Sequence, residues 1–337
     1  MRRSCLVHLG VHKTGSSSIQ QTLHALSRGA DWQYLPLATP NHSRTLMDAF
    51  ATQPEMAHHN RLRGMGLADR PVLRQAALAA LDAASAAVSL PRTILSGEGL
   101  VNLDPDGVQR FAAWLDARFS QVRLVAYIRE PHSWMESTFQ ERLKGRDGRI
   151  GLMDLFPRYR HQLEKYELCF GSDTLDYLSF AREALHKGCV VQDFAHRYGL
   201  DVQPEAIRIA NEGLGLLAVQ ILQACRSFAP DRPFGRQLVA RLERLGGPKL
   251  RFSGQLTAPA FAHHQQDLNW MAARVDLPPQ VRRDGIPAFE ALLHFPAGQT
   301  NAAFRDLGWP DLADPGPVLD PARVARHVLD CAERGRA

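Results

Sequence analysis

The sequence has few cysteines and no long apolar run, and both absences narrow the classes of protein to which it can belong. Its five cysteines are scattered, odd in number and never spaced as CxxC. This pattern argues against a disulfide framework or a zinc site, and it favours a reducing cytoplasm. No stretch approaches the ~20 consecutive apolar residues that a membrane-spanning helix needs. The basic start is followed by an apolar run too short for a signal peptide, so we interpret that run as a first strand. We therefore expect a cytoplasmic protein without a transmembrane segment.

The charge is only moderately unbalanced, with a net value of +5 and a pI near 9.1. Such an excess suits an anionic cofactor or acceptor, and it also suits non-specific attraction to nucleic acid. The sequence contains no recognised nucleic-acid module and no basic helix with interleaved aromatic residues. We therefore expect a small-molecule or glycan acceptor and no nucleic-acid partner. The oligomeric state is not indicated.

Short apolar segments alternate with amphipathic ones along most of the chain. Strands are predicted over 4–9, 92–96, 122–128 and 189–194. Helices are predicted over 17–27, 72–88, from Pro105 to Phe119, from Pro131 to about Leu143, and over 213–226. This order predicts an α/β fold with a mostly parallel central sheet that helices flank on both faces.

The remaining segments have little periodicity. Residues 28–71 are expected to form a loop-rich insertion with at most short helices, within an α/β domain that covers 1–277. Residues 278–337 are expected to pack on that domain as a proline-rich extension, irregular up to 320 and ending in a helix near 321–334.

Residues 7–20 combine an apolar strand, a loop that holds Gly10, Lys13 and Gly15, and the start of an amphipathic helix. The N–H groups of a helix N-terminus, a lysine and several hydroxyls suit a phosphate-like anion. The hydroxyls are those of Thr14, Ser16, Ser17 and Ser18. Serine capping would explain a hydroxyl here, but it would not explain the lysine at a strand-to-helix turn. Because Lys13 precedes Gly15, whereas the ATPase P-loop places lysine after its second glycine, the pattern favours a sulfate donor over ATP.

A second motif follows the strand over 122–128. Arg129 ends that strand, and Ser137 comes eight positions later, about two turns into a helix that Pro131 opens. An arginine fork and a serine hydroxyl can share one phosphate. Alternatively, Arg129 forms a surface pair with an acidic residue and the serine is incidental. Both motifs, like Glu98 in its Gly-Glu-Gly segment, follow predicted strands, and ligands of parallel sheets bind beyond the carboxyl ends of the strands.

Together, Lys13-Thr14-Gly15-Ser16-Ser17 and Arg129-Glu130-Pro131 with Ser137 resemble the two nucleotide-binding motifs of the PAPS-dependent sulfotransferases, where PAPS is 3′-phosphoadenosine 5′-phosphosulfate. The chain looks closest to the bacterial carbohydrate-type enzymes. A weaker resemblance continues through 190–194, Asn211-Glu212 and 267–270. The resemblance implies a P-loop-like architecture in which the first motif, with Ser18, holds the 5′-phosphosulfate and the second holds the 3′-phosphate. It also implies transfer of a sulfuryl group from PAPS to a hydroxyl or amine, on a carbohydrate or glycolipid, without a metal.

The resemblance also implies a general base, which in this family is a histidine or a glutamate. Glu98 is the leading candidate because it follows the strand over 92–96, and His12, beside Lys13, is the competing one. Lys13 is expected to stabilise the charge that grows on the bridging oxygen of the leaving group. Two other functions stay open: a P-loop kinase-like NTP phosphotransferase, in which Glu98 would serve a metal, and a nucleotide-binding module without catalysis.

The adjacent pair His58-His59 does not favour a metal site, because neighbouring side chains diverge and no cysteine or acidic triad is nearby. With Arg61, Arg63 and Arg70, this segment is interpreted as a solvated loop or, alternatively, as a wall of the acceptor cleft.

Overall fold

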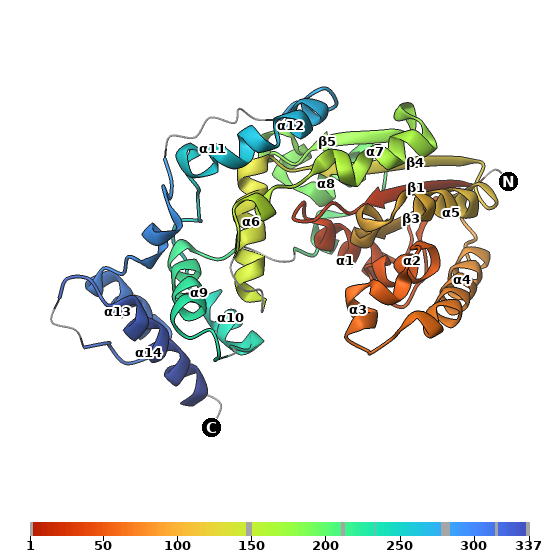
Figure 1. Cartoon of the computed structure of the whole chain (residues 1–337). Coiled ribbons are helices and arrows are strands. Elements are labelled where there is room, and N and C mark those ends of the chain that lie inside the picture. The colour runs from red at the N-terminus through yellow and green to blue at the C-terminus, as the bar shows by residue number, and fades with distance from the viewer. Residues whose placement is uncertain are drawn as a thin grey trace. The chain divides into compact units, whose positions relative to one another are not determined.

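The computed structural model describes residues 3–145, 150–209, 213–232, 234–277, 284–313 and 316–334; Asn211-Glu212 lie outside these ranges. Five strands form one sheet in the order β2-β3-β1-β4-β5, and every neighbouring pair is parallel (Figure 1). The strands are β1 (Ser4–Leu9), β2 (Trp32–Tyr34), β3 (Arg92–Gly97), β4 (Gln121–Ile128) and β5 (Leu175–Ser179). The predicted α/β class with a parallel sheet is confirmed.

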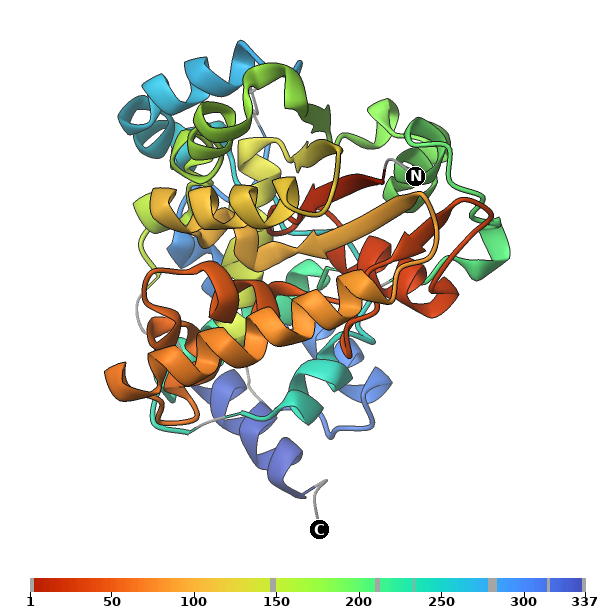
Figure 2. The same cartoon turned by 90° about the vertical axis from the view of Figure 1, so that its right-hand side faces the viewer.

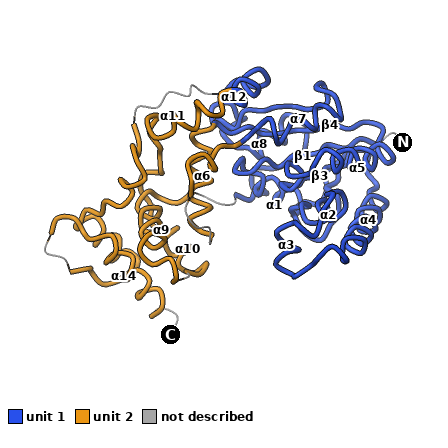
Figure 3. The backbone as a smooth tube through the Cα atoms, in the orientation of Figure 1, with its two compact units in different colours: residues 1–130, 158–211, 266–278 blue, residues 131–157, 212–265, 279–337 orange. Residues whose placement is uncertain are grey.

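The chain divides into two compact units, which Figure 3 colours separately. The first unit (1–130, 158–211 and 266–278) contains the sheet. Its helices are α1 (Ser16–Leu26), α2 (Ser43–Phe50), α3 (His58–Arg61), α4 (Arg70–Ala86), α5 (Pro105–Asp116), α7 (Tyr159–Phe170), α8 (Val190–Arg197) and most of α12 (Gln265–Ala272). The expected division of the chain at 277/278 stays a prediction.

The second unit (131–157, 212–265 and 279–337) is helical in its described part. Its helices are α6 (Pro131–Lys144), α9 (Leu216–Phe228), α10 (Arg236–Leu242), α11 (Gly254–His263), α13 (Ala297–Asp306) and α14 (Pro321–Arg334). Helices α9 and α14 pack against each other, and their buried apolar residues form part of this unit's core.

Helices cover both faces of the sheet, as Figure 2 also shows. Along β4, alternate side chains point to opposite faces, so Leu124 and Ala126 enter one apolar cluster while Val125 and Tyr127 enter another. The first cluster includes residues of α2, α4, α5 and α7; the second includes residues of α1 and α8. The loops after β1, β3 and β4 therefore share the carboxyl edge of a sheet that is buried on both sides.

Several predicted boundaries are confirmed by specific contacts. The Asp104 carboxylate accepts a hydrogen bond from the Gly107 N–H at 2.7 Å and so caps α5. The apolar face of α5 is buried through Val108, Phe111 and Leu115, as its helical spacing predicts. Helix α6 begins at Pro131, where the missing N–H of proline costs no helical hydrogen bond.

The strand predicted over 189–194 is wrong, because this segment forms helix α8. Val190 and Phe194 are four residues apart and share a buried helical face that packs against the sheet and α1. The fifth strand is β5 instead, which pairs with β4. A short apolar run is compatible with the two-residue period of a strand and with the 3.6-residue period of a helix. Here tertiary packing determined that the segment is helical.

Two segments are more ordered than predicted. Within 28–71, β2 adds an edge strand beside β3 that was not predicted, whereas α2 (eight residues) and α3 (four residues) are short helices of the kind expected there. Within 278–320, α13 is a helix of ten residues that follows Pro296, so this described stretch is not irregular. The predicted terminal helix is confirmed as α14.

Two further observations concern the cysteines and the length of the helices. All five cysteines are free, with Cys5 buried and Cys189 only half-buried beside α8. Among the described residues, no helix combines the length and the apolar character needed to cross a membrane.

Candidate functional site

The β1–α1 loop, residues 10–15, has an unusual backbone. Lys13 (φ 67°) and Gly15 (φ 73°) both adopt left-handed conformations, so the chain turns sharply before α1 begins at Ser16. A Cβ atom on Gly15 would lie 2.8 Å from Cγ1 of Val190, which leaves no room for a side chain. The glycine of the first motif is therefore required both by its backbone angle and by the packing of α8.

Two hydroxyls of the first motif stabilise the loop itself. The Thr14 hydroxyl donates to the Val11 carbonyl at 2.6 Å, and the Ser16 hydroxyl donates to the same oxygen at 3.3 Å. Both side chains are buried. Ser18 is also buried, whereas Ser17 is half-buried. Binding of an anion by these four residues stays a prediction, and for Thr14 and Ser16 the observed hydrogen bonds give the hydroxyls a structural role.

The first turn of α1 is suited to negative charge. It contains no acidic residue. The Ser18 N–H donates to the Gly15 carbonyl at 2.9 Å, so this N–H group is not offered to a ligand. The N-terminus of a helix carries a partial positive charge from its aligned peptide dipoles. Lys13 lies three residues before Ser16, the first residue of α1, so the lysine and the helix N-terminus belong to the same turn.

Arg129, at the end of β4, reaches the first motif. Its Nη1 donates to the Lys13 carbonyl at 2.8 Å across 116 residues of sequence, and its guanidinium lies 5.8 Å from the ring centre of Phe180. The Tyr159 hydroxyl donates to the Arg129 carbonyl at 2.6 Å and fixes the backbone at the strand end. Burial raises the pKa of Tyr159 well above its usual value, so this hydroxyl keeps its proton. The structure thus brings the two sequence motifs together through Lys13 and Arg129.

The remaining residue of the second motif, Ser137, belongs to the second unit. It lies on α6, six residues after Pro131, and is half-buried. A role for Ser137 in binding a phosphate stays a prediction from the sequence.

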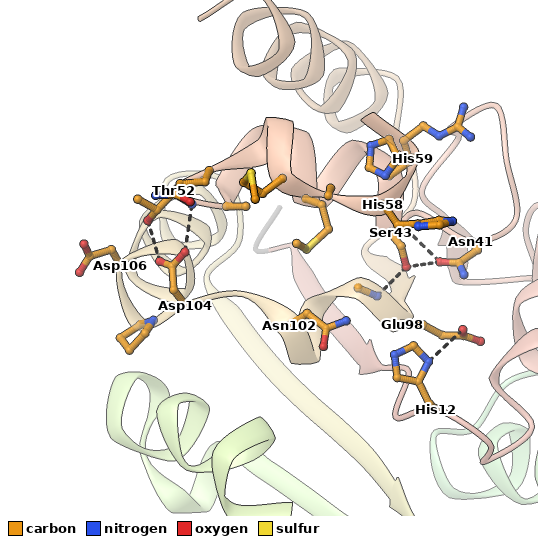
Figure 4. A pocket seen from close by; sticks show the side chains of 18 residues that line it. His12, Asn41, Ser43, Thr52, His58, His59, Glu98, Asn102, Asp104 and Asp106 are labelled. Atoms are coloured by element: carbon orange, nitrogen blue, oxygen red, sulfur yellow. Dashed lines mark hydrogen bonds and ion pairs between the residues drawn. The ribbon is translucent and has the colours of Figure 1, made fainter. Parts of the chain in front are cut away.

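Glu98 and His12, the two candidate bases, are neighbours. Glu98 lies on the short 3-10 helix η3 (Glu98–Asn102) directly after β3, and its Oε2 is 3.5 Å from Nδ1 of His12 (Figure 4). A Cβ atom on Gly10 would lie 2.9 Å from Cγ of Glu98, so the glycine lets the first loop pass close to this carboxylate. Both side chains are partly exposed, at 41% for His12 and 24% for Glu98. Either group can therefore reach solvent or a substrate.

A pocket of about 870 Å³ in the first unit extends from these two residues. Its walls come from the β1–α1 loop, from the segment 41–59 and from η3 with the start of α5 (Figure 4). The lining residues are His12, Asn41, Ser43, Arg44, Met47, Ala51, Thr52, Gln53, Met56, Ala57, His58, His59, Glu98, Gly99, Asn102, Asp104, Pro105 and Asp106. Its size suits a small organic molecule or part of a larger one.

The pocket wall is held by polar contacts that sequence reasoning did not anticipate. The Ser43 hydroxyl accepts from the Gly99 N–H at 2.6 Å and so ties α2 to η3. Asp104 accepts from the Thr52 hydroxyl at 2.7 Å as well as from Gly107. Burial opposes ionisation of Asp104, but these hydrogen bonds outweigh it and lower its pKa. A polar residue in a non-periodic segment has no sequence signal of its own, and only the folded geometry reveals these contacts.

The two histidines of the pair His58-His59 have different surroundings. His58 is exposed, whereas Nε2 of His59 lies 2.8 Å from Oδ1 of Asp48. Both histidines line the pocket, so this part of the segment forms a wall, while Arg70 pairs with Glu55 instead. Among the described residues, no group of three or more histidine, cysteine or acidic side chains is placed to hold a metal ion.

A buried polar network includes His8 and Ser96, which shortly precede the pocket residues His12 and Glu98 in the sequence. Nδ1 of His8 is 2.8 Å from the Ser96 hydroxyl, and the Ser96 N–H donates to Nδ1 of His42 at 3.4 Å. Both histidines are fully buried, and burial lowers the pKa of each to about 3. Gln20 adds a hydrogen bond to the same hydroxyl at 3.1 Å. Both imidazoles are thus neutral in the native protein at neutral pH.

Comparison with known proteins identified few similar proteins. No protein-family model matches it, and no curated protein matches it either. Among solved structures, it is similar to a sulfotransferase from Alicyclobacillus acidocaldarius, with a TM-score of 0.41 and 14% identity over 82% of this chain and 98% of that one.

Proposed function

We propose that this chain is a sulfotransferase that transfers a sulfuryl group from PAPS to a hydroxyl or amine of an acceptor, either a carbohydrate or a glycolipid. The acceptor oxygen or nitrogen forms a bond to sulfur as the bond from sulfur to the bridging oxygen of the donor breaks. Glu98 takes the proton of the acceptor, Lys13 stabilises the leaving oxygen, and adenosine 3′,5′-bisphosphate departs. Such transfer is promoted mainly by positioning and by neutralisation of charge.

The observation that carries this proposal is the hydrogen bond from Arg129 to the Lys13 carbonyl. A donor phosphorylated at both its 5′ and 3′ positions needs two cationic groups near each other. Here the guanidinium of Arg129 meets the backbone of Lys13, beyond the ends of β4 and β1, which are neighbours in the sheet, and we propose that the two side chains supply these groups. The glycine-rich turn and the first turn of α1 complete the proposed 5′ side.

The pocket supports an acceptor beside the candidate base. Glu98 and His12 form one end of its lining, and the rest of the wall comes from residues outside both nucleotide motifs. We propose that the acceptor binds there with its reacting hydroxyl toward Glu98. No metal takes part in this proposed reaction.

Ligand-dependent thermal unfolding tests the donor. We expect adenosine 3′,5′-bisphosphate, at about a hundredfold excess over its Kd, to raise the Tm by roughly 4–7 °C, because a ligand that binds only the native state stabilises it. Magnesium–ATP and ADP serve as matched comparisons. Stabilisation by magnesium–ATP but not by the bisphosphate would support a kinase-like phosphotransferase instead. Stabilisation by the bisphosphate without transfer from PAPS to any acceptor in a screen of sugars, lipids and phenols would support a non-catalytic module.

Removal of either cation should weaken this binding. We expect Lys13→Ala and Arg129→Ala each to raise the Kd for the bisphosphate by about tenfold or more, since each deletes a charged hydrogen-bond donor to phosphate. Titration calorimetry measures the Kd. Arg123→Ala is the control, because it removes an arginine from the same strand that pairs with Asp176 instead. An unchanged Kd for the bisphosphate in Lys13→Ala would show that Lys13 does not bind the donor.

A further inference from the structure

Exposed apolar side chains gather in one short part of the first unit. Of the nine large hydrophobic residues that are exposed among those described, four lie within residues 56–72. They are Met56, Leu62, Leu67 and Val72, with exposed fractions of 56%, 75%, 68% and 67%. We call residues 56–72 the α3–α4 surface. Single exposed apolar residues are common, but a concentration of this kind marks an interaction site.

The local fold explains why these side chains point outward. The α3–α4 surface consists of the end of the 3-10 helix η1 (Pro54–Met56), the one-turn helix α3, a tight turn at Gly64 (φ 71°), the 3-10 helix η2 (Leu67–Asp69) and the start of α4. Its inward contact comes from Asn60, which donates to Asp48 at 2.6 Å, and Leu73, the residue that follows this surface, is buried. In Figures 1 and 2, the connection between α3 and α4 runs along the periphery of the first unit. The core therefore does not use these four apolar groups.

The exposed charges of the α3–α4 surface are positive. Arg61 and Arg63 flank Leu62, and both arginines are exposed. Arg63 bonds to the neutral amide oxygen of Asn60 at 3.5 Å and so keeps its charge available. The acidic residue of the segment, Asp69, accepts from the Gly66 N–H at 2.8 Å at the beginning of its own short helix. The surface is therefore apolar and cationic at once.

We infer that the α3–α4 surface docks on an anionic lipid bilayer. Leucine, valine and methionine side chains enter the headgroup region, while nearby arginines pair with lipid phosphates and are attracted by the negative surface potential. Charge complementarity favours this occupant, since nucleic acid would engage the arginines but leave the exposed apolar groups in water. The attachment is peripheral and reversible, because α3 and the 3-10 helix over 67–69 have one turn each and α4, with 17 residues, is shorter than the ~20 residues that a membrane-spanning helix needs.

The position of this surface beside the pocket has a consequence for the acceptor. Met56 and His58 belong both to the α3–α4 surface and to the pocket lining. A docked protein would therefore hold the pocket next to the headgroups, and the acceptor would be a lipid-linked hydroxyl. This consequence rests on the proposed function, whereas the docking does not.

Vesicle flotation tests the docking without any sulfuryl donor, so the two proposals fail separately. The full chain is mixed with vesicles of phosphatidylcholine alone or with about a third phosphatidylglycerol. We expect flotation only with the anionic vesicles, and loss of it at high salt. Arg61→Glu/Arg63→Glu and Leu62→Ser/Leu67→Ser should each reduce the bound fraction at least about tenfold.

A control variant makes one change of each kind elsewhere in the first unit. Leu168 (82% exposed) and Arg208 are exposed outside the α3–α4 surface, so Leu168→Ser/Arg208→Glu should float as the wild type does. Thermal unfolding with and without the bisphosphate checks that each variant is folded. The inference is wrong if the wild type stays unbound with both vesicles, or if the surface variants float normally. It is also wrong if sedimentation shows a dimer that the leucine variant dissociates, because a second copy would then be the occupant.

Discussion

Glu98→Gln is expected to lower kcat for sulfuryl transfer by about a hundred- to ten-thousandfold, the range that general-base catalysis usually contributes. Glutamine keeps the size of the side chain but cannot accept the proton of the acceptor. The Kd for adenosine 3′,5′-bisphosphate should change little, because the proposed donor contacts lie on the β1–α1 loop and at Arg129. Steady-state kinetics with labelled PAPS and titration calorimetry measure the two quantities separately.

Two further variants show whether a loss of kcat in Glu98→Gln reflects loss of the general base. Asp106→Asn removes another carboxylate of the same pocket, and an equal loss of kcat there would indicate a general effect of pocket charge instead of proton transfer. His12→Asn removes the partner that lies 3.5 Å from Glu98. If Glu98→Gln retains turnover and His12→Asn abolishes it, the base is His12 and Glu98 orients it.

Acidification is expected to destabilise the first unit well above the pH at which carboxylates titrate. His8 and His42 have pKa values of about 3 in the native state, because burial disfavours their charged forms. In the unfolded chain the pKa of a histidine is about 6.5. As the pH falls below 6.5, the unfolded state binds two protons that the native state does not, so stability present above that pH is lost progressively down to about pH 3. Between pH 7 and 5 the two histidines together should remove about 4 kcal/mol from the free energy of unfolding.

Urea unfolding at a series of pH values measures this slope. His8→Asn/His42→Asn should flatten it, even if the variant is less stable at pH 7, because the amide oxygen can replace Nδ1 and does not titrate. His161→Gln, which removes an exposed histidine, should keep the slope of the wild type. An unchanged slope in the double variant would assign the acid sensitivity to other groups. Carboxylates whose native pKa is lowered, such as Asp193, act in the same direction but at lower pH.

Much of the fold followed from periodicity in the sequence. The strands over 4–9, 92–96 and 122–128 were predictable because each is an apolar run before a glycine or arginine and a helix. The segment 189–194 was not, because Val190 and Phe194 satisfy a strand and a helix equally well until α1 packs against them. Edge strand β2 has only three residues, too few for a periodic signal.

The candidate site was predictable where side-chain chemistry alone defines it. Lys13, Gly15 and Arg129 carry recognisable spacing, and the structure places Lys13 and Arg129 in contact. That contact uses a backbone carbonyl, which has no sequence signature, and the supporting Tyr159 comes thirty residues later. The pocket was predictable only in part, because its polar wall depends on contacts such as the bond of Ser43 to the Gly99 N–H, which no residue pattern encodes.

Much of the pocket wall comes from the segment 41–59, and this affects how the acceptor specificity of such a protein can change in evolution. Most of this wall belongs to the crossover between β2 and β3, whereas the proposed donor loop belongs to β1 and α1. Insertions and substitutions in the exposed loops of a crossover are tolerated far better than changes in the strands it connects or in buried residues such as Leu46 of α2. Descendants of one ancestor could therefore acquire new acceptors by exchanging this crossover, while His12 and Glu98 stayed fixed at its border. In the history of such a chain, acceptor choice and donor choice would evolve at separate rates.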